Sequence, residues 1–362
     1  MLKHDQQYIK QQNKQWVYEL IKEQEPITKP NLVKQTKMSP TSIGRIVSDL
    51  VEQSLIIEAP SESTGVGRNA VRLEINRNTL WSIGVELDMD TIRIGLINLK
   101  GELCKTKETA FQVRGEAVNA LNKVAAFIEE LLVEENLNKQ NILGIGIGVP
   151  GLIHKDEGIV VHSDQLLWEN VDVGAYVEAQ TGLDVFVDNE LKMQVMAEQH
   201  KRDVEKDPTM VLVGIGSGVG SAVVINGDIY RGQSNRAGEI GHTIVNPHGN
   251  MCKCGRMGCL ATYVSEKSLL QQAQNGLNTE TMEELSTYYK QGNPLARSII
   301  DQATMYIAIA IGNVCSTFDP KTIVLSGQFF SYLPEARQTV EENSSDDSSP
   351  DSVQFSSLNS WF

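Results

Sequence analysis

The sequence predicts an α/β protein in which a winged helix-turn-helix head, residues 1–78, is followed by a two-lobed body. Three observations support this fold class. Short amphipathic segments with helix-start signals fill the head, strands alternate with helices from residue 79 onward, and a cysteine-rich loop interrupts the second lobe. The chain of 362 residues, 41% of them hydrophobic, is long enough for two or three domains with cores of their own.

The distribution of charge separates the head from the body. Residues 1–77 contain 11 basic and 9 acidic side chains, whereas the whole chain has a formal net charge of −14. Only the head therefore has a balance that suits contact with a polyanion. The polar N-terminus lacks the apolar core of a signal peptide, and no apolar run predicts a bilayer span, so we expect a cytoplasmic protein.

Three helices are predicted in the head. The first begins near Asn13, and the second follows Thr28 as its N-cap. Ser39 caps the third, with Pro40 at the first helical position, where no backbone N–H is needed. Apolar residues then recur at helical spacing and predict one buried face: Ile43, Ile46, Val47, Leu50 and Val51.

The opposite face of the third helix carries Thr41, Ser42 and Arg45, side chains that hydrogen-bond base edges and phosphates. Two strands, "LIIEAP" and "AVRLEI", follow around a glycine-containing tip with Arg68. This order is typical of a winged helix-turn-helix that places its third helix in the major groove of double-stranded DNA and its wing on the backbone. The alternative is a three-helix module for protein–protein contacts.

The body is predicted to form a first lobe over residues 79–188 and a second lobe over residues 189–330, with a cleft between them. The first lobe opens with the hairpin "LWSIGVEL" and "TIRIGLINLKGEL", followed by the helix "AVNALNKVAAFIEELLVEE" and the strands "ILGIGIGVPG" and "DVFVDNE". The second contains the strand pair "TMVLVGIGSGVGSAVVINGDIY", the long helix "NPLARSIIDQATMYIAIAIGNVCSTFD" and the strand "TIVLSG".

The glycine-rich "GIGIGVPG" matches G-x-G-x-x-G through Gly146, Gly148 and Gly151. A dinucleotide fingerprint also needs a tight turn into a helix, but Pro150 interrupts the run and no helical pattern follows. We therefore exclude a dinucleotide site. The run "GIGSGVG" joins two strands and predicts a turn with close backbone approach.

Three of the five cysteines gather in one glycine-rich loop, "GHTIVNPHGNMCKCGRMGC". Cys252, Cys254 and Cys259 with His242 have the spacing H-x9-C-x-C-x4-C, which is a complete tetrahedral set for a structural Zn²⁺. His248 is a rival for the histidine position. A disulfide or free thiols are the alternatives, and a cytosolic setting disfavours the disulfide.

The stretch "GEIGHTIVNPHGNMCKCGRMGCL" resembles the signature of the ROK family, which contains bacterial sugar kinases and sugar-responsive repressors. "GIGIGVPGLI", "LLWENVDV" and "GIGSGVGSAVVINGDIYRG" resemble the family in the same order, so the resemblance covers residues 80 to about 327. Together with the head, it is most similar to the xylose repressors of Gram-positive bacteria. The resemblance implies an actin-like, ribonuclease-H-like body and selects His242 rather than His248 as the fourth zinc ligand.

The resemblance also implies a sugar pocket. The family's G-E-I-G-H motif places Glu239 and His242 in it, and the Asn-Glu pair that is common in family repressors places Asn189 and Glu190 there. A carboxylate accepts hydrogen bonds from sugar hydroxyls, and zinc would hold the glycine-rich loop still. Ala261 stands where the family usually has a sugar-binding Glu, so this pocket has one carboxylate fewer.

The kinase features of the family are altered. Its phosphate loop, D-x-G-G-T, is replaced by "ELDMDT", in which Glu86, Asp88 and Met89 stand at the Asp and the two Gly positions. The family's catalytic Asp is replaced by Glu190, one methylene longer. We therefore expect no catalysis: the protein would be a sugar-responsive repressor, a homodimer or larger oligomer bound to operator DNA and released by xylose or a related sugar. The alternatives are a ROK sugar kinase with a fused head, and an activator or repressor that answers to a protein partner.

The C-terminal residues 331–362 depart from the family, which normally continues into a final helix that packs back on the first lobe. Here "ENSSDDSSPDS" is acidic and of low complexity. We expect residues 331–362 to be a partly disordered tail without that helix. The stretch "LKMQ" after the Asn-Glu pair is also unusual, because the family commonly has small residues there.

Overall fold

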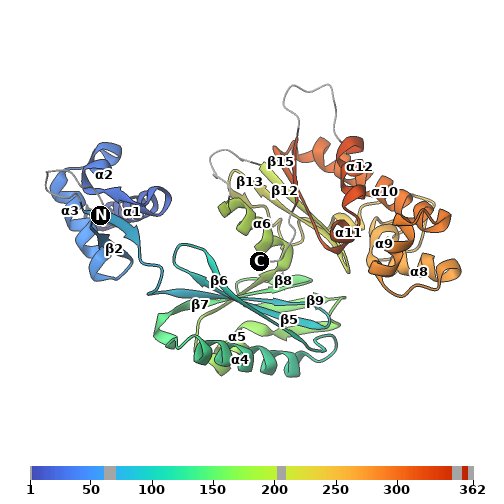
Figure 1. Ribbon diagram of the computed structural model, residues 1–362, viewed down its shortest axis with the longest axis horizontal. Coiled ribbons are helices and arrows are strands. Elements are labelled where there is room, and N and C mark those ends of the chain that lie inside the picture. The colour runs from blue at the N-terminus through green and yellow to red at the C-terminus, as the bar shows by residue number, and fades with distance from the viewer. Residues whose placement is uncertain (1, 61–70, 202–208, 345–352, 358–362) are drawn as a thin grey trace.

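The computed structural model describes residues 2–60, 71–201, 209–344 and 353–357. A small head and two larger lobes follow one another along the chain (Figure 1). This architecture confirms the predicted α/β fold with a helix-turn-helix head and a two-lobed body.

The head consists of three helices and a three-stranded sheet. The helices are α1 (Leu2–Gln24), α2 (Lys29–Thr36) and α3 (Pro40–Glu52), and the sheet has the order β1 (Ile27–Thr28), β3 (Arg72–Ile75), β2 (Ile56–Ala59). Apolar side chains of all three helices form its core, among them Val17, Ile21, Leu32, Ile43 and Val47. The predicted N-cap is confirmed, because the Ser39 hydroxyl accepts a hydrogen bond from the backbone N–H of Ser42 at 3.2 Å.

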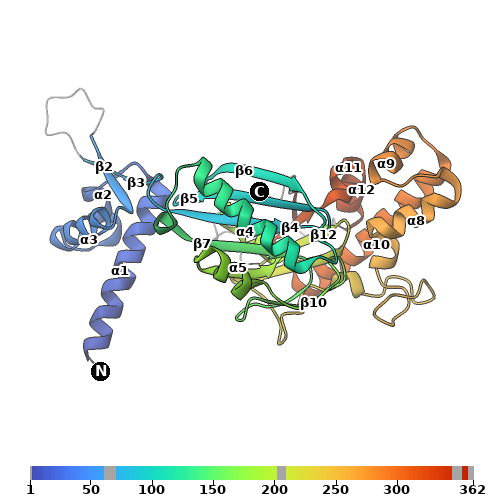
Figure 2. The ribbon, with the colours of Figure 1, turned by 90° about the horizontal axis from the view of Figure 1, so that it is seen from below.

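The first helix of the head is longer than predicted. Helix α1 begins at Leu2 rather than near Asn13, and its N-terminal half extends beyond the head core (Figure 2). The extra turns are polar, so no apolar stripe announces them. Strands β2 and β3 pair antiparallel as expected for a wing, whereas Arg68 at its tip lies outside the described residues.

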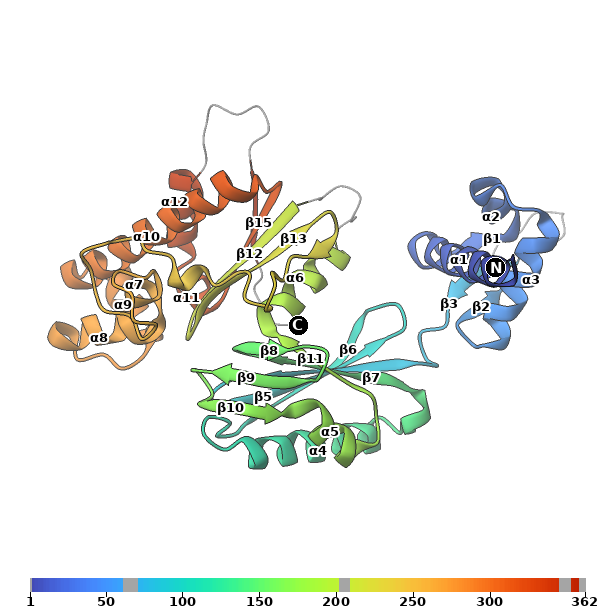
Figure 3. The same cartoon turned by 180° about the vertical axis from the view of Figure 1, so that it is seen from behind.

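The first lobe is built on a five-stranded sheet. Its order is β11 (Val185–Asn189), β7 (Ile142–Val149), β4 (Trp81–Leu87), β5 (Thr91–Asn98), β6 (Leu103–Ala110). Helices α4 (Ala117–Glu134) and α5 (Val173–Thr181) cover the face that points away from the second lobe (Figures 1 and 3). A 3-10 turn (Lys139–Asn141) precedes β7, and a small sheet follows it: β8 (Leu152–His154), β9 (Ile159–Ser163) and β10 (Trp168–Asp172).

The second lobe repeats the plan of a sheet between helices. The strand order is β14 (Asp228–Ile229), β13 (Val219–Ile225), β12 (Thr209–Ile215), β15 (Thr322–Ser326), β16 (Gln354–Ser357). Alternate residues of β12 face opposite sides. Met210 and Leu212 contact α6 (Glu190–Lys201), and Val211 and Val213 contact the cluster around α10 (Pro294–Phe318). The remaining helices are η3 (Ile240–His242), α7 (Ala261–Val264), α8 (Glu266–Leu277), α9 (Met282–Lys290), α11 (Gln328–Tyr332) and α12 (Pro334–Ser344).

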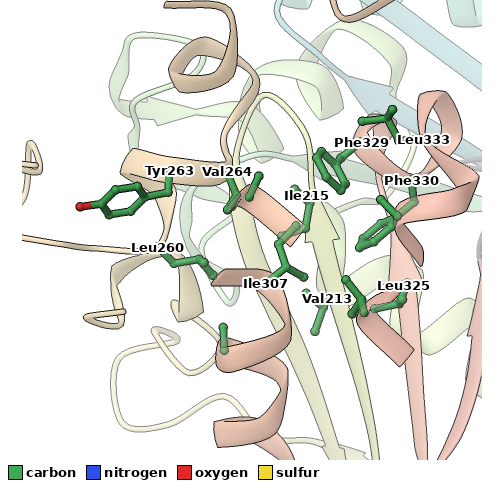
Figure 4. Packing of buried hydrophobic residues seen from close by; sticks show 14 of the residues in the cluster. Val213, Ile215, Leu260, Tyr263, Val264, Ile307, Leu325, Phe329, Phe330 and Leu333 are labelled. Atoms are coloured by element: carbon green, nitrogen blue, oxygen red, sulfur yellow. The ribbon is translucent and has the colours of Figure 1, made fainter. Parts of the chain in front are cut away.

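Helix α10 does not overturn the expectation of no bilayer span. It is long and apolar enough to cross a membrane by length and composition, although no bilayer span was predicted. Its apolar residues, including Ile300, Ile307 and Ile311, are instead buried in the core of the second lobe, and Figure 4 labels Ile307 among them. Helix α10 is therefore a central core helix of the second lobe.

The predicted C-terminal tail is partly wrong. Leu333, directly before α12, and Ala336 and Val340 within it are buried in the core of the second lobe, and β16 extends the sheet as a parallel partner of β15 (Figure 4 shows Leu333). Only these three apolar residues, spaced i, i+3, i+7, attach the helix to the core. The rest of the segment is polar, so its sequence did not predict a helix. Most of "ENSSDDSSPDS" lies outside the described residues.

Candidate functional site

A cleft of about 1850 Å³ lies between the two lobes. Asn189, Glu190, Glu239 and His242 all line it, although 53 positions separate the first from the last in the sequence. The structure thus brings the four predicted sugar-binding residues to one cleft. Asn189 and Glu190 come from the junction of β11 and α6, and the other two come from the segment that enters η3.

Asn189 is held in a fixed orientation at the start of α6. Its Oδ1 accepts hydrogen bonds from the backbone N–H groups of Leu191 (3.1 Å) and Lys192 (3.3 Å), as an N-capping side chain does. Its Nδ2 donates to the carbonyl of Gly151 at 3.2 Å and to Oε2 of Glu190 at 2.7 Å. The amide therefore fixes the carboxyl group of Glu190 as well as the helix start.

Burial raises the pKa of Glu190 to about 8, and the nearby carboxylates of Glu86, Asp88 and Glu239 raise it further, against a backbone hydrogen bond that lowers it. At neutral pH this carboxyl group therefore carries a proton. A protonated carboxyl both donates and accepts hydrogen bonds, which suits a sugar hydroxyl and does not suit a general base.

The glycine run "GIGSGVG" makes room for the start of α6. A Cβ at Gly214 would lie 2.6 Å from Cδ2 of Leu191, and a Cβ at Gly220 would lie 2.8 Å from its Cδ1. The two glycines of β12 and β13 thus let Leu191 pack directly on the strands. The close approach predicted for this run is therefore between the two strands and Leu191, the residue that follows Glu190.

A polar network that the sequence analysis missed holds the segment leading to Glu239. Arg231 donates two hydrogen bonds to Asp188, at 3.1 and 2.6 Å, and buried Lys192 donates to both oxygens of Asn235 at 2.7 Å. Asn235 in turn donates to the carbonyl of Ile153 in the first lobe at 2.8 Å. The unusual "LKMQ" stretch was the sequence signal for this network, because its lysine, Lys192, is the residue that bonds to Asn235.

The predicted metal ligands converge on one point. The ligand atoms of His242, Cys252, Cys254 and Cys259 all lie within 4.8 Å of one another. His242 Nδ1 lies 3.6 Å from the sulfur of Cys252, and the sulfurs of Cys254 and Cys259 are also 3.6 Å apart. Tetrahedral Zn²⁺ with ordinary bond lengths requires ligand separations of about 3.5–3.8 Å. The four residues therefore fit Zn²⁺.

His248 is exposed and is not part of this group. Nδ1 of His242 faces the thiols, and His242 also lines the cleft. A hydrogen bond from Arg256 lowers the pKa of Cys254 to about 6, whereas burial and the neighbouring thiols raise the pKa of Cys259.

The position of the family's phosphate loop is occupied by acidic groups. Asp88 Oδ1 accepts a hydrogen bond from the backbone N–H of Met89 at 2.8 Å, so this N–H is not free for a phosphate. Burial raises the pKa of Glu86 to about 7, although its partner Arg93, at 3.1 Å, acts in the opposite direction. Burial also raises the pKa of Glu266, with further contributions from Asp88 and Asp90. Acidic side chains, Asp88 and Glu266, therefore line the cleft beside this position.

In the head, Thr41, Ser42 and Arg45 are exposed on α3, as predicted. Lys10 and Lys14 of α1 line a small groove together with Arg45, and Lys14 pairs with Asp49 at 2.7 Å. Lys10 was missed because its helix was expected to begin near Asn13, whereas Lys14 lies within the predicted helix and was not singled out. Their spacing of four residues was the available signal.

The fold and the cleft define a two-lobed, actin-like α/β protein that carries a helix-turn-helix head. The chain belongs to the ROK family, whose model matches residues 82–345.

Two curated proteins and one solved structure show what this chain is similar to. A xylose repressor of Caldicellulosiruptor bescii is 26% identical over 93% of this chain and 89% of its own length. A glucokinase of Halalkalibacterium halodurans is 28% identical over 68% of this chain and 80% of its own length. The crystal structure of a ROK family transcriptional regulator, a homologue of the Escherichia coli Mlc protein, has a TM-score of 0.76 and 29% identity, and covers 93% of this chain and 89% of its own.

Proposed function

We propose that this protein is a sugar-responsive transcriptional repressor that binds operator DNA and is released by a sugar inducer. One observation carries the proposal. The cleft keeps the polar side chains that would bind a sugar, whereas Asp88 and Met89 replace the two glycines that would leave room for a phosphate. The same chain carries a helix whose exposed face would read DNA. Binding without phosphoryl transfer is the behaviour of a sensor. The kinase alternative lacks such support.

On the sugar side, the protonated carboxyl of Glu190 would donate one hydrogen bond and accept another, and Asn189 keeps it in place. Glu239 would accept hydrogen bonds from hydroxyls, and His242 would offer Nε2. Ala261 also lines the cleft and adds no polar group. The inducer would be xylose or a related sugar, in keeping with the xylose repressors among the similar proteins.

His242, Cys252, Cys254 and Cys259 would hold one Zn²⁺ as a structural ion. A filled tetrahedral set leaves no open position for catalysis, so the ion would supply rigidity. Ligation through Nδ1 would fix the ring of His242 and direct Nε2 into the cleft.

On DNA, Thr41, Ser42 and Arg45 would read base edges in the major groove, and Arg68 would contact the backbone. Two copies of the chain would place two heads on the half-sites of an inverted repeat, as symmetric regulators do. Such a repressor would act in the cytoplasm.

The decisive variant is Glu239→Ala. Glu239 lines the cleft and is remote from α3 in the chain, so the variant should keep operator affinity without sugar and lose release by sugar. A ligand shifts an equilibrium only by its differential affinity for the two states. The measurement is binding to a duplex that the wild-type protein selects from a random library, with and without D-xylose and related sugars. Loss of DNA binding by Glu239→Ala in the absence of sugar would contradict the division between a sensing body and a reading head.

A further inference from the structure

The head joins the first lobe around one buried carboxylate. Glu25, directly after α1, has a side chain only 5% exposed. Its Oε2 accepts a hydrogen bond from the backbone N–H of Ile75 at 2.6 Å, and its Oε1 accepts from Arg77 and from Lys100. We call Glu25, Arg77 and Lys100 the Glu25 joint.

The donors of the Glu25 joint come from separate parts of the chain. Ile75 ends strand β3 of the wing, Arg77 lies in the linker, and Lys100 lies in the turn between β5 and β6 of the first lobe. A buried carboxylate is costly unless its charge is paired, so these parts are held in one arrangement. The turn contributes an apolar contact as well, because Leu99 packs against the core of the head.

The turn itself is braced from within. The Asn98 side-chain oxygen accepts hydrogen bonds from the backbone N–H groups of Lys100 and Glu102, each at 3.0 Å. The carboxylate of Glu102 accepts from Asn98 at 2.8 Å and from Arg77 at 3.2 Å. Lys100 is therefore presented to Glu25 from a rigid turn.

Strand β5 connects this joint to the cleft. It runs from Thr91 to Asn98, a length of about 27 Å for eight residues. At its other end the Thr91 carbonyl accepts a hydrogen bond from the backbone N–H of Asp88, which lines the cleft. One hydrogen-bonded strand thus has the cleft at one end and the head at the other.

We propose that the Glu25 joint couples the sugar cleft to the DNA-binding head, with Glu25 and Lys100 as the positioning residues that fix the orientation of the head on the first lobe. The inference rests on the proposed function, which it extends by naming the contact through which sugar binding changes operator affinity. A head that turned freely on its linker would not respond to the state of the cleft.

The test uses Lys100→Met in the full-length protein, which keeps the side-chain stem and removes its charge. Lys100→Arg restores a donor. Lys105→Met is the matched control, because Lys105 lies in the adjoining β6 and pairs at 3.3 Å with Glu135 of the same lobe rather than with the head. Two readouts are needed: the ratio of affinities for a library-selected duplex without and with D-xylose, and the hydrogen-exchange rate of the Ile75 amide.

Wild type and Lys105→Met should show the same ratio, in the range of about 5- to 150-fold typical of allosteric coupling. Lys100→Met should bring the ratio close to 1 and speed exchange of the Ile75 amide, while binding duplex without xylose and binding xylose itself. Lys100→Arg should recover most of the ratio, which a merely destabilised head would not do. A Lys100→Met variant with the full wild-type ratio overturns the inference.

A different experimental result would show that the proposed function itself is wrong. If wild type selects no duplex, or if neither D-xylose nor a related sugar alters its binding, the repressor proposal fails whatever the variants do. The Glu25 joint is then judged by exchange alone, and an unchanged rate at Ile75 in Lys100→Met overturns it.

Discussion

Glu190 should make the stability of the protein depend on pH in a recognisable way. Its pKa in the folded protein, about 8, is above the ordinary 4.5, so its contribution to stability is complete below about pH 4.5 and is lost as the pH rises through 8. Glu190→Gln removes the titration. The free energy of unfolding of the variant minus that of wild type should therefore increase with pH between 5 and 8, by up to about 1.4 kcal/mol per pH unit.

Chemical denaturation at several pH values measures this difference, and subtraction cancels the titration of groups that both proteins share. Glu178→Gln, an exposed change on α5, serves as the control and should give a difference that is independent of pH. A flat difference for Glu190→Gln would mean that this carboxyl is ionised throughout.

The metal centre gives a second prediction for single residues. Cys254→Ser should lose the one Zn²⁺ per chain, because a hydroxyl is a poor replacement for a thiolate ligand. His248→Ala should retain it, since that histidine lies outside the cluster. Elemental analysis of protein purified without chelators measures both, and equal zinc contents in the two variants would reject the ligand set.

Which residues could be predicted from the sequence depends on how local their chemistry is. The spacing of His242, Cys252, Cys254 and Cys259 marks a metal site within 18 residues. By contrast, Lys192 meets Asn235 43 positions away, and Glu25 meets Lys100 75 positions away. No pattern within a segment reports such pairs, because only the fold brings them together.

Helix α3 is the secondary-structure element that we propose to read DNA bases. Arg45→Ala should weaken binding to the selected duplex by about 1–3 kcal/mol if the guanidinium contacts a guanine, and should weaken random-sequence duplex much less. Fluorescence anisotropy with both duplexes measures the two effects. Lys139→Ala, which removes one exposed charge from the first lobe, should change neither. Equal losses on both duplexes would assign Arg45 to phosphate contact.

Elements with a strong periodic apolar pattern were predictable, and those without one were not. Helix α3 shows its N-cap and its apolar stripe in the sequence; the structure has the N-cap and buries Ile43, Ile46, Val47 and Leu50, whereas Val51, at the end of the predicted stripe, is exposed. In the N-terminal half of α1, which was missed, the apolar residues whose side chains are described, Tyr8 and Ile9, are exposed. Strand β16 is four residues long and polar at its ends, and its pairing with β15 is a long-range contact that local propensity does not encode.

For the whole molecule, the expected outcome with ATP and Mg²⁺ is an absence of sugar phosphorylation above background. Asp88 and Met89 stand at the positions of the two phosphate-loop glycines, and the backbone N–H of Met89 already donates to Asp88, so the backbone cradle for a phosphate is missing. A coupled assay with D-xylose and D-glucose measures turnover, with a ROK glucokinase as the positive control. Turnover at the rate of that control would replace the repressor proposal with the kinase alternative.

Strand β16 has a consequence for the solubility of the protein. Its partner β15 is buried along all five residues, from Thr322 to Ser326, and without β16 one side of that strand would present unpaired backbone groups. An uncovered apolar strand at a sheet edge is a template for pairing with another chain, which is a common start of aggregation. The few residues of β16 therefore cap the sheet against intermolecular strand addition, and a chain shortened before Gln354 would be prone to self-association through β15.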